Sequence, residues 1–384
     1  MLIEKTGVTR YVKSKATPGY TLFSPTGQHH TYIIDMEGNV VHKWKRPHPP
    51  GSYYYLEPDG NLLGAMRTDV VQLRLPAPGG KLCKLDWKGK TLWEFTDDYQ
   101  HHDFRRCPNG NIVYLRWELM SKKAQKRVKG GIPGTEHPDG IYCDAVREIT
   151  PAGELVWEWR VAEHMDIENY PLCPICDRRE MAHANTIFPL PNGNFLISFR
   201  NIHLVAEIDR KTKKFVWKMH HPNLGHQHDI RRLDNGNYMI FCNGMHSHYY
   251  PPEDGSRVIE IDPRQNNKVV WQYHGKPPVS FESTFISGAV RLWSGNTLIC
   301  EGRWGRIFEV TPDGEIVWNY VSPYFNDDAS SPMVGSNSVF RAFRYADDSP
   351  EIAGRLPRLK KTRRAVKPKA KKAKSAGKKI RRVS

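Results

Sequence analysis

The chain has 384 residues, of which 39% are hydrophobic and 11% aromatic, so it can bury a sizeable core. No apolar run approaches the ~18 residues that a membrane-spanning helix needs, which excludes a membrane protein of that type. The net charge is +16, but 15 of the 57 Lys and Arg residues lie in Arg355–Ser384, and the rest of the chain has 42 basic and 41 acidic residues. The globular part is therefore nearly neutral.

The N-terminal segment, residues 1–19, precedes the first strand pattern. Met1–Pro25 lacks the apolar core of a secretory signal, so we expect a cytoplasmic protein. The chain has seven cysteines, an odd number, and in that compartment they indicate reduced thiols rather than a disulfide framework.

One segment type recurs six times: a short β-rich strand, a turn, and a second strand that ends near a tryptophan. TPDGEIVWNY is one copy, and β-branched and aromatic residues around a Gly, Asp or Pro turn are typical of a hairpin. The shared residues are Trp44, Trp93, Trp157, Trp217, Trp271 and Trp318. Their spacings of 49, 64, 60, 54 and 47 residues indicate an internal repeat.

A second hairpin lies between these copies, with an X-Gly-Asn turn, as in YYYLEPDGNLL and NTIFPLPNGNFLISF. We interpret X-Gly as a two-residue turn in which glycine supplies the positive φ. Two hairpins per unit give four strands. The sequence therefore predicts an all-β fold, a six-bladed β-propeller of four-stranded blades over residues 20–350.

Two segments depart from the repeat. Residues 119–129 are predicted to be helical, within an insertion that reaches about Tyr142 and is typical of a lid or specificity loop. Ser336–Tyr345 has no Gly-Asn turn, and we expect it to close the ring beside the first blade's N-terminal strands.

Residues 351–384 are predicted to form a disordered Lys/Arg-rich tail. Arg355–Ser384 has the charge to bind nucleic acid or another polyanion by counterion release, without sequence-specific readout. The alternative is a solubilising terminus. No feature demands a dimer, and the sequence leaves the oligomeric state open.

The Gly-Asn turns place polar residues at one end of the central channel. Counted from the turn glycines, three pairs are predicted to face each other: His102 and Trp117, Asn185 and Arg200, His228 and Asn243. His183, two residues before Asn185, shares its strand face. Three histidines from successive blades should therefore meet at one opening with Arg200.

Two chemistries fit this ring. A neutral imidazole could act as nucleophile while Arg200 binds the oxygens of a sulfate or phosphate group. Alternatively, His102, His183 and His228, with His246 or His248, could bind Zn, Cu or Fe in an oxidoreductase or lyase acting on aromatic compounds. Arg200 beside a metal cation would be electrostatically unfavourable, because both are positively charged, and this favours the first chemistry. A third interpretation is a non-enzymatic propeller platform tethered to nucleic acid by the tail.

Cys173 and Cys176 form a lone C-x-x-C motif. A zinc site would need two further ligands, and no second C-x-x-C exists, so a metal or redox role remains open from the sequence.

The sequence resembles the bacterial arylsulfotransferase propeller family over about Tyr20–Tyr345. The similar stretches are HHD at His101, HANT at His183, ISFRN at Arg200 and QHD at His228. TPDGEIVWNY is also typical of that family.

The resemblance implies a ping-pong transfer of a sulfuryl group from a phenolic sulfate ester to a phenol, without the nucleotide donor PAPS or another cofactor. It implies that His228 is sulfated and that His102, His183 and Arg200 hold the group, while Trp117, Asn185 and Asn243 are candidate contacts for the aromatic substrate. The chain departs from the exported members by its lack of a signal and by its basic tail.

Overall fold

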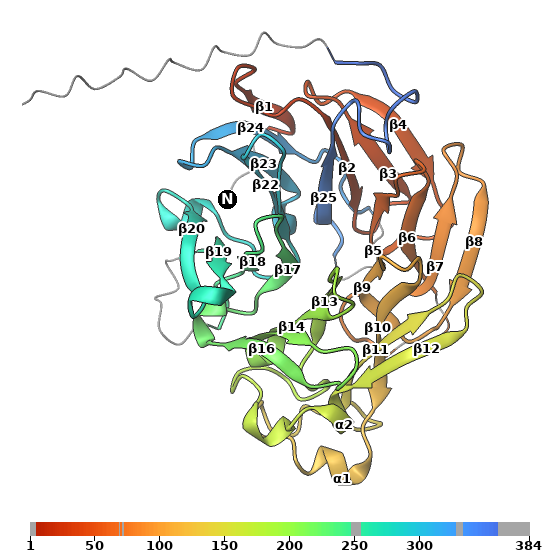
Figure 1. Cartoon of the computed structure of the whole chain (residues 1–384), viewed down its shortest axis with the longest axis vertical. Coiled ribbons are helices and arrows are strands. Elements are labelled where there is room, and N and C mark those ends of the chain that lie inside the picture. The colour runs from red at the N-terminus through yellow and green to blue at the C-terminus, as the bar shows by residue number, and fades with distance from the viewer. Residues whose placement is uncertain (1–4, 69, 71–72, 247–254, 328–332, 360–384) are drawn as a thin grey trace, which may run out of the picture.

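The structure is a computed structural model that describes residues 5–68, 70, 73–246, 255–327 and 333–359. Six antiparallel sheets surround a central axis (Figure 1), which confirms the six-bladed propeller. The tail beyond residue 359, and His248, lie outside the described residues.

The strands of each blade follow one another from the axis outward. Blade 1 contains β25 (Val339–Tyr345), β2 (Tyr20–Pro25), β3 (His30–Ile34) and β4 (Val40–Lys45). Blade 2 contains β5 (Pro50–Leu56), β6 (Leu62–Arg67), β7 (Gly80–Leu85) and β8 (Thr91–Thr96). Blade 3 contains β9 (Gln100–Arg106), β10 (Ile112–Leu119), β11 (Tyr142–Ile149) and β12 (Leu155–Arg160).

The remaining blades follow in chain order. Blade 4 contains β13 (Ala184–Pro189), β14 (Phe195–Phe199), β15 (Leu204–Ile208) and β16 (Phe215–His220). Blade 5 contains β17 (His228–Arg232), β18 (Tyr238–Cys242), β19 (Arg257–Asp262) and β20 (Lys268–His274). Blade 6 contains β21 (Gly288–Arg291), β22 (Thr297–Glu301), β23 (Arg306–Val310) and β24 (Ile316–Val321), with β1 (Gly7–Tyr11) on its outer edge.

The ring closes through the C-terminal strand, as predicted. β25 pairs antiparallel with β2, with Tyr345 opposite Tyr20. β1 adds a second closure that the sequence did not predict, because it pairs with β24 of the last blade. Both end strands of the propeller are therefore held in sheets, and their pairing closes the ring.

The six repeated tryptophans link neighbouring blades. Each indole N–H donates to the outer hairpin turn of the next blade, as Trp44 does to the Asp86 carbonyl at 3.0 Å and Trp93 to the Pro151 carbonyl at 2.8 Å. Trp318 of the last blade donates to the Met36 carbonyl of the first at 2.8 Å. The repeat therefore fixes blade-to-blade spacing as well as burying apolar surface.

The Gly-Asn turns are longer than the two-residue turns predicted. In the β9–β10 hairpin, Cys107 N donates to Asn111 O at 2.8 Å and Gly110 N donates to Cys107 O at 2.9 Å. Three residues therefore form the loop, and Gly110 has a φ of +87°. This geometry changes the register by one residue relative to the prediction, and Ile112 lies opposite Arg106.

The predicted helix over residues 119–129 is largely wrong. Leu119 ends β10, and only one helical turn follows, α1 (Lys122–Gln125), capped by the Ser121 side chain. No residue of α1 is buried, so the segment has no apolar face to stabilise a longer helix. A second short helix, α2 (Val161–His164), follows β12.

Part of the segment predicted as tail packs on the propeller. Ile352 is fully buried, Leu359 contacts the core of blade 1, and Tyr20 donates a hydrogen bond to the Pro357 carbonyl at 2.7 Å. Residues 351–359 thus pack as an extension of the globular part.

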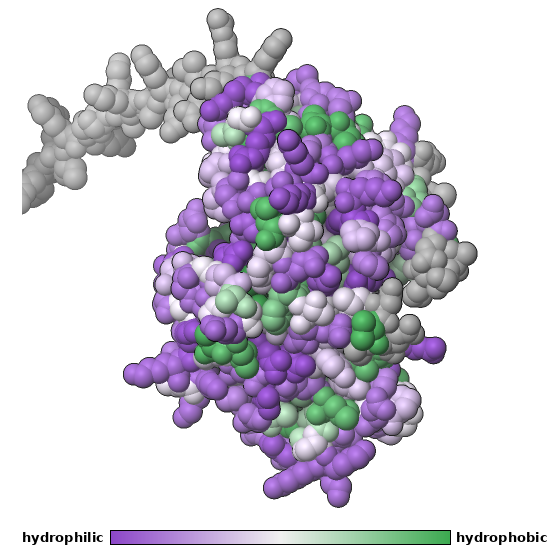
Figure 2. All heavy atoms as spheres, turned by 90° about the vertical axis from the view of Figure 1, so that its right-hand side faces the viewer, coloured by the Kyte–Doolittle hydropathy of each residue, from purple (hydrophilic) through white to green (hydrophobic). Residues whose placement is uncertain are grey.

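The outer strands are amphipathic: in β8 and β16 the more exposed residues alternate with less exposed ones. Figure 2 shows the resulting mostly hydrophilic face with scattered apolar side chains. Within the described part of the chain, no helix combines the length and the apolar character needed to cross a bilayer.

Candidate functional site

A cavity of about 990 Å³ contains the side chains that the sequence singled out as catalytic. His102, His183, Arg200 and His228 all line it, and so does Trp117. The residues come from blades 3, 4 and 5, so the structure brings together the three histidines and the arginine that lie far apart in the sequence. The catalytic roles themselves stay predictions.

The three predicted cross-strand pairs are wrong in register, although the residues lie near one another. His228 lies opposite Phe241 rather than Asn243, and Leu115 lies opposite His101. The turn length accounts for one residue of this change. The rest comes from β-bulges in β9, β13 and β17, each located where the strand approaches the cavity.

Residues at and near these bulges have an unusual backbone conformation. His102 and His183, which line the cavity, have φ values of +48° and +57°. Asp229 and Ser287, which are buried behind its wall, have φ values of +52° and +88°. A left-handed conformation costs a residue other than glycine about 1–3 kcal/mol, and such residues cluster at sites where side-chain direction matters. The pattern indicates that the inner strands are shaped to aim side chains into the cavity.

His228 is held in one tautomer by its neighbours. Its Nδ1 lies 2.8 Å from Asn243 Oδ1 and 3.1 Å from the His226 carbonyl oxygen, and both partners are acceptors. Nδ1 therefore carries the hydrogen, and Nε2 keeps the lone pair that a nucleophile needs.

His183 is paired with a carboxylate that the sequence did not reveal. Its Nδ1 lies 2.5 Å from Glu180 Oε1, and Glu180 Oε2 accepts the indole N–H of Trp117 at 3.2 Å. Burial raises the pKa of Glu180 to about 7. Such a carboxylate orients the imidazole and can stabilise its protonated form.

His102 belongs to a third pair. Its ring contacts that of His183, with centroids 4.6 Å apart, and its Nδ1 lies 2.8 Å from Nδ1 of His101. His101 stacks on Trp117 and lies 3.4 Å from a carboxylate oxygen of Asp144. A chain of polar groups therefore supports each of the three histidines from behind.

The histidines are kept neutral by their surroundings. Burial lowers the pKa of His183 and of His228 well below the usual value, and the positive charge of Arg200 adds to this effect. Burial and the neighbouring His183 do the same for the pKa of His102. A neutral imidazole is the form that attacks an electrophile, so the arrangement suits nucleophilic chemistry.

Arg200 supplies positive charge to the cavity wall. It begins the short 3-10 helix η2 (Arg200–Ile202), and its guanidinium Nη1 donates to the side-chain amide oxygen of Asn201 at 2.8 Å. This partner is a neutral amide, so it leaves the positive charge of the guanidinium in place. The fork of N–H donors can therefore bind an anionic group in the cavity.

The three predicted substrate contacts lie in different places. Trp117 lines the cavity, whereas Asn185 and Asn243 are buried behind its wall. Asn185 donates to the Gln227 carbonyl at 2.8 Å, and Asn243 donates to the Ser283 carbonyl at 2.7 Å. On geometry, only Trp117 can contact a substrate, while Asn243 positions His228.

The sequence of the chain matches the model of the arylsulfotransferase (ASST) family over residues 79–323. The chain belongs to the arylsulfotransferase family. The match covers blades 3 to 5 and nearly all of blade 6, and thus all four residues at the centre of the cavity. No curated protein matches the chain.

Several solved structures are similar to this arylsulfotransferase family member. A protein of unknown function from Bacteroides caccae shares its fold: it is 14% identical with a TM-score of 0.52, and the alignment covers 85% of this chain and 98% of that one. A streptogramin B lyase is 12% identical with a TM-score of 0.47, covering 85% and 87%. Virginiamycin B lyase from Staphylococcus aureus is 13% identical with a TM-score of 0.41, covering 71% and 70%.

The sequence also did not reveal a buried ion network beneath the cavity. Arg341 of β25 lies 3.2 Å from Asp103 and 3.3 Å from Asp229, the acidic residues of HHD and QHD. Asp103 accepts the Ile187 backbone N–H and Asp229 that of Ala289, so each carboxylate links two inner strands. Asp103 and Asp229 each directly follow a cavity histidine in the sequence, and this shared position could have indicated the network.

Four side chains at the cavity wall form a second cluster, and two of them, Cys176 and His246, line the cavity. Cys173, Cys176, His226 and His246 place one potential ligand atom each within 4.8 Å of the others. In the described residues this is the single such group of three or more His, Cys, Asp or Glu side chains, so the alternative metal set of His102, His183 and His228 does not meet the same criterion. All seven cysteines are buried and free of disulfides.

Proposed function

We propose that this chain is a PAPS-independent sulfotransferase that moves a sulfuryl group from a phenolic sulfate ester to a phenolic acceptor. Membership of the arylsulfotransferase family supports the reaction class. The observation that carries the proposal is that His228, Arg200 and two further histidines line one cavity, and that His228 is neutral and held in a single tautomer.

In the first half-reaction, Nε2 of His228 attacks the sulfur atom of the donor. An N–S bond forms while the S–O bond to the phenol breaks, which leaves a sulfo-histidine and a phenolate. Arg200 binds the sulfuryl oxygens, whose negative charge its guanidinium matches.

The phenolate takes its proton from solvent, because burial and the charge of Arg200 keep His183 neutral before the reaction, and His183 serves instead as the base of the second half-reaction. Glu180 at Nδ1 stabilises the imidazolium form of His183 and fixes its ring. His102 contacts His183 and completes the polar surface around the sulfuryl group. Trp117 offers an aromatic face for the phenol ring.

In the second half-reaction, His183 accepts the proton of the incoming phenol as its oxygen attacks sulfur. The N–S bond breaks, the new ester leaves, His183 releases the proton to solvent, and both histidines return to their starting states. No oxidant, reductant or nucleotide enters this balance.

A nitrophenyl sulfate donor with a phenol acceptor tests the proposal, because transfer releases coloured nitrophenol. With donor alone, we expect intact protein to gain the mass of one SO₃ group, and His228→Asn to show neither this gain nor turnover. Absence of both signals in the unmodified protein would contradict the proposal. Asn235→Ser, in the turn of the β17–β18 hairpin and outside the cavity lining, is a matched control that should retain both.

A further inference from the structure

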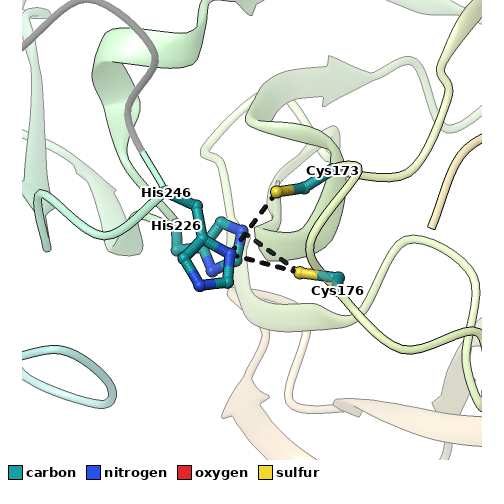
Figure 3. A group of neighbouring side chains, drawn as sticks. All are labelled: Cys173, Cys176, His226 and His246. Carbon is teal, nitrogen blue, oxygen red and sulfur yellow. Dashed lines mark hydrogen bonds between the residues drawn. The ribbon is translucent and has the colours of Figure 1, made fainter. Parts of the chain in front are cut away.

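The C-x-x-C motif gains two partners in the folded chain. Figure 3 shows Cys173 and Cys176 on one side and the rings of His226 and His246 on the other, with the sulfur and nitrogen atoms directed toward a common centre. The histidines come from the two ends of the β17–β18 hairpin, and the cysteines come from the loop before β13. We propose that these four residues bind one Zn²⁺ ion.

The separations of the four ligand atoms fit a tetrahedral site. Cys173 Sγ lies 3.4 Å from His246 Nδ1, and Cys176 Sγ lies 3.5 Å from both His246 Nδ1 and His226 Nε2. With Zn–S and Zn–N bonds of about 2.3 and 2.05 Å, the S···N edge of a tetrahedron is about 3.6 Å. Three of the six edges are therefore close to the tetrahedral value, and all four ligand atoms lie within 4.8 Å of one another.

The burial of the cluster favours metal binding over a group of solvated surface side chains. Cys173, Cys176 and His226 are buried, and His246 is half-buried. The Cys176 N–H donates to the Cys173 carbonyl at 3.0 Å, which forms the tight turn that directs both sulfur atoms the same way. Thiols are weak donors and weak acceptors, so without a metal the two imidazoles would have poor partners.

The donor set selects the ion. Two thiolates and two imidazoles are soft to intermediate ligands that suit Zn²⁺ and not Ca²⁺ or Mg²⁺, which take oxygen ligands. Four protein ligands close the coordination sphere, so the ion would be structural and would not bind substrate. The competing chemistry for the same cysteines is a Cys173–Cys176 disulfide, which would remove both thiolates.

The cluster connects two parts of the cavity wall. Cys173 N donates to the Asn201 carbonyl at 2.9 Å, and the Asn201 side chain accepts from Arg200. His226 lies two residues before His228, at the start of β17. A zinc ion here would fix the positions of Arg200 and His228 relative to each other.

Metal analysis of untagged protein, purified under reducing conditions and reconstituted with Zn²⁺, tests the proposal. We expect about one zinc per chain, and Cys176→Ser should lower the zinc retained after gel filtration at least about tenfold. Cys242→Ser, a buried cysteine of the adjacent β18, is the matched control and should retain zinc.

Two measurements on the unmodified chain keep the test valid if a cysteine variant fails to fold. Replacement of zinc by Co²⁺ should give the strong visible bands of a tetrahedral site with thiolate ligands. Zinc should also protect Cys173 and Cys176 from alkylation, as read by peptide mass. Less than a tenth of an equivalent of zinc after reconstitution, unchanged alkylation, or a Cys173–Cys176 disulfide in the zinc-treated protein would each overturn the proposal. None of these readouts depends on sulfotransfer.

Discussion

The imidazole of His228 donates from Nδ1 to the side-chain oxygen of Asn243 at 2.8 Å. Asn243 is itself fixed, because its amide nitrogen donates to the carbonyls of Ser283 and Ile286 at 2.7 and 3.1 Å. The nitrogen that we propose as the nucleophile is thus defined by Asn243, which does not line the cavity. A fixed tautomer lowers the cost of bringing Nε2 to the sulfur atom.

Replacement of Asn243 by Ala should therefore slow catalysis without weakening substrate binding. We expect kcat to fall about 10- to 100-fold, since a group that orients a reactive residue contributes on this scale, and KM for the donor to change little. Asn243→Asp keeps an acceptor oxygen and should recover part of kcat. Steady-state kinetics with a nitrophenyl sulfate donor measures both, and equal losses in kcat for Ala and Asp would contradict the role assigned to the oxygen.

The contact between Glu180 and His183 predicts a pH dependence. Burial raises the pKa of Glu180 to about 7, so the carboxylate that supports a protonated His183 is present only above that pH. Activity should rise as pH increases through about 7, and Glu180→Gln should lower kcat and abolish this limb of the profile. A Gln variant with an unchanged profile would assign the limb to another group.

Ionisation of the Glu180 carboxyl, which should raise activity, should lower the stability of the fold. A carboxyl whose folded-state pKa is raised binds its proton more tightly when folded, so its contribution is complete below its unfolded pKa and is lost as pH rises through about 7. Glu180→Gln should therefore stabilise the protein at pH 8 by up to about 3 kcal/mol and change little at pH 4. Denaturant unfolding at the two pH values measures the difference, and destabilisation at pH 8 would contradict it.

Sequence spacing was sufficient to predict the blade number, the closing strand and the three cavity histidines with Arg200. The blade number and the cavity residues depend on position within the repeat, and the closing strand was predicted because Ser336–Tyr345 is a strand pattern without a Gly-Asn turn. The cross-strand pairs failed because they depend on turn length and on bulges at His102 and His228, which change register without a distinct residue signature.

Glu180, and the placement of His246 beside the C-x-x-C motif, were missed for a different reason. Glu180 lies in the loop before β13, outside any repeat, and reaches His183 through a local turn. His246 lies 73 residues from Cys173, and only the packing of the blade 4 loop against blade 5 brings them together. Contacts between irregular segments carry no periodicity from which a sequence could predict them.

The Arg341 network makes a prediction about folding. Arg341 is buried between Asp103 and Asp229, so Arg341→Met would remove a cation that both buried carboxylates share. Asp229 would keep Arg231 at 2.8 Å and Asp103 would keep Arg105 at 3.7 Å, so we expect a loss of about 3 kcal/mol in the free energy of unfolding, the lower end for a broken buried pair. Arg358→Met removes an exposed pair with Asp348 and should cost less than about 1 kcal/mol. Chemical denaturation of both variants checks the contrast, and similar losses would refute it.

The basic tail should bind polyanions independently of the cavity, and the structure sets where to cut it. Residues 360–384 hold 13 Lys and Arg residues and no acidic ones, whereas Ile352 and Leu359 pack on the propeller. Truncation after Leu359 should abolish salt-sensitive binding to a DNA oligonucleotide and leave turnover within about twofold, because the lost term is counterion release. Truncation after Pro350 should instead lower the melting temperature, since it removes the fully buried Ile352. Fluorescence anisotropy across a salt series measures the binding. If the protein truncated after Leu359 retained its DNA affinity, the polyanion site would lie on the propeller instead.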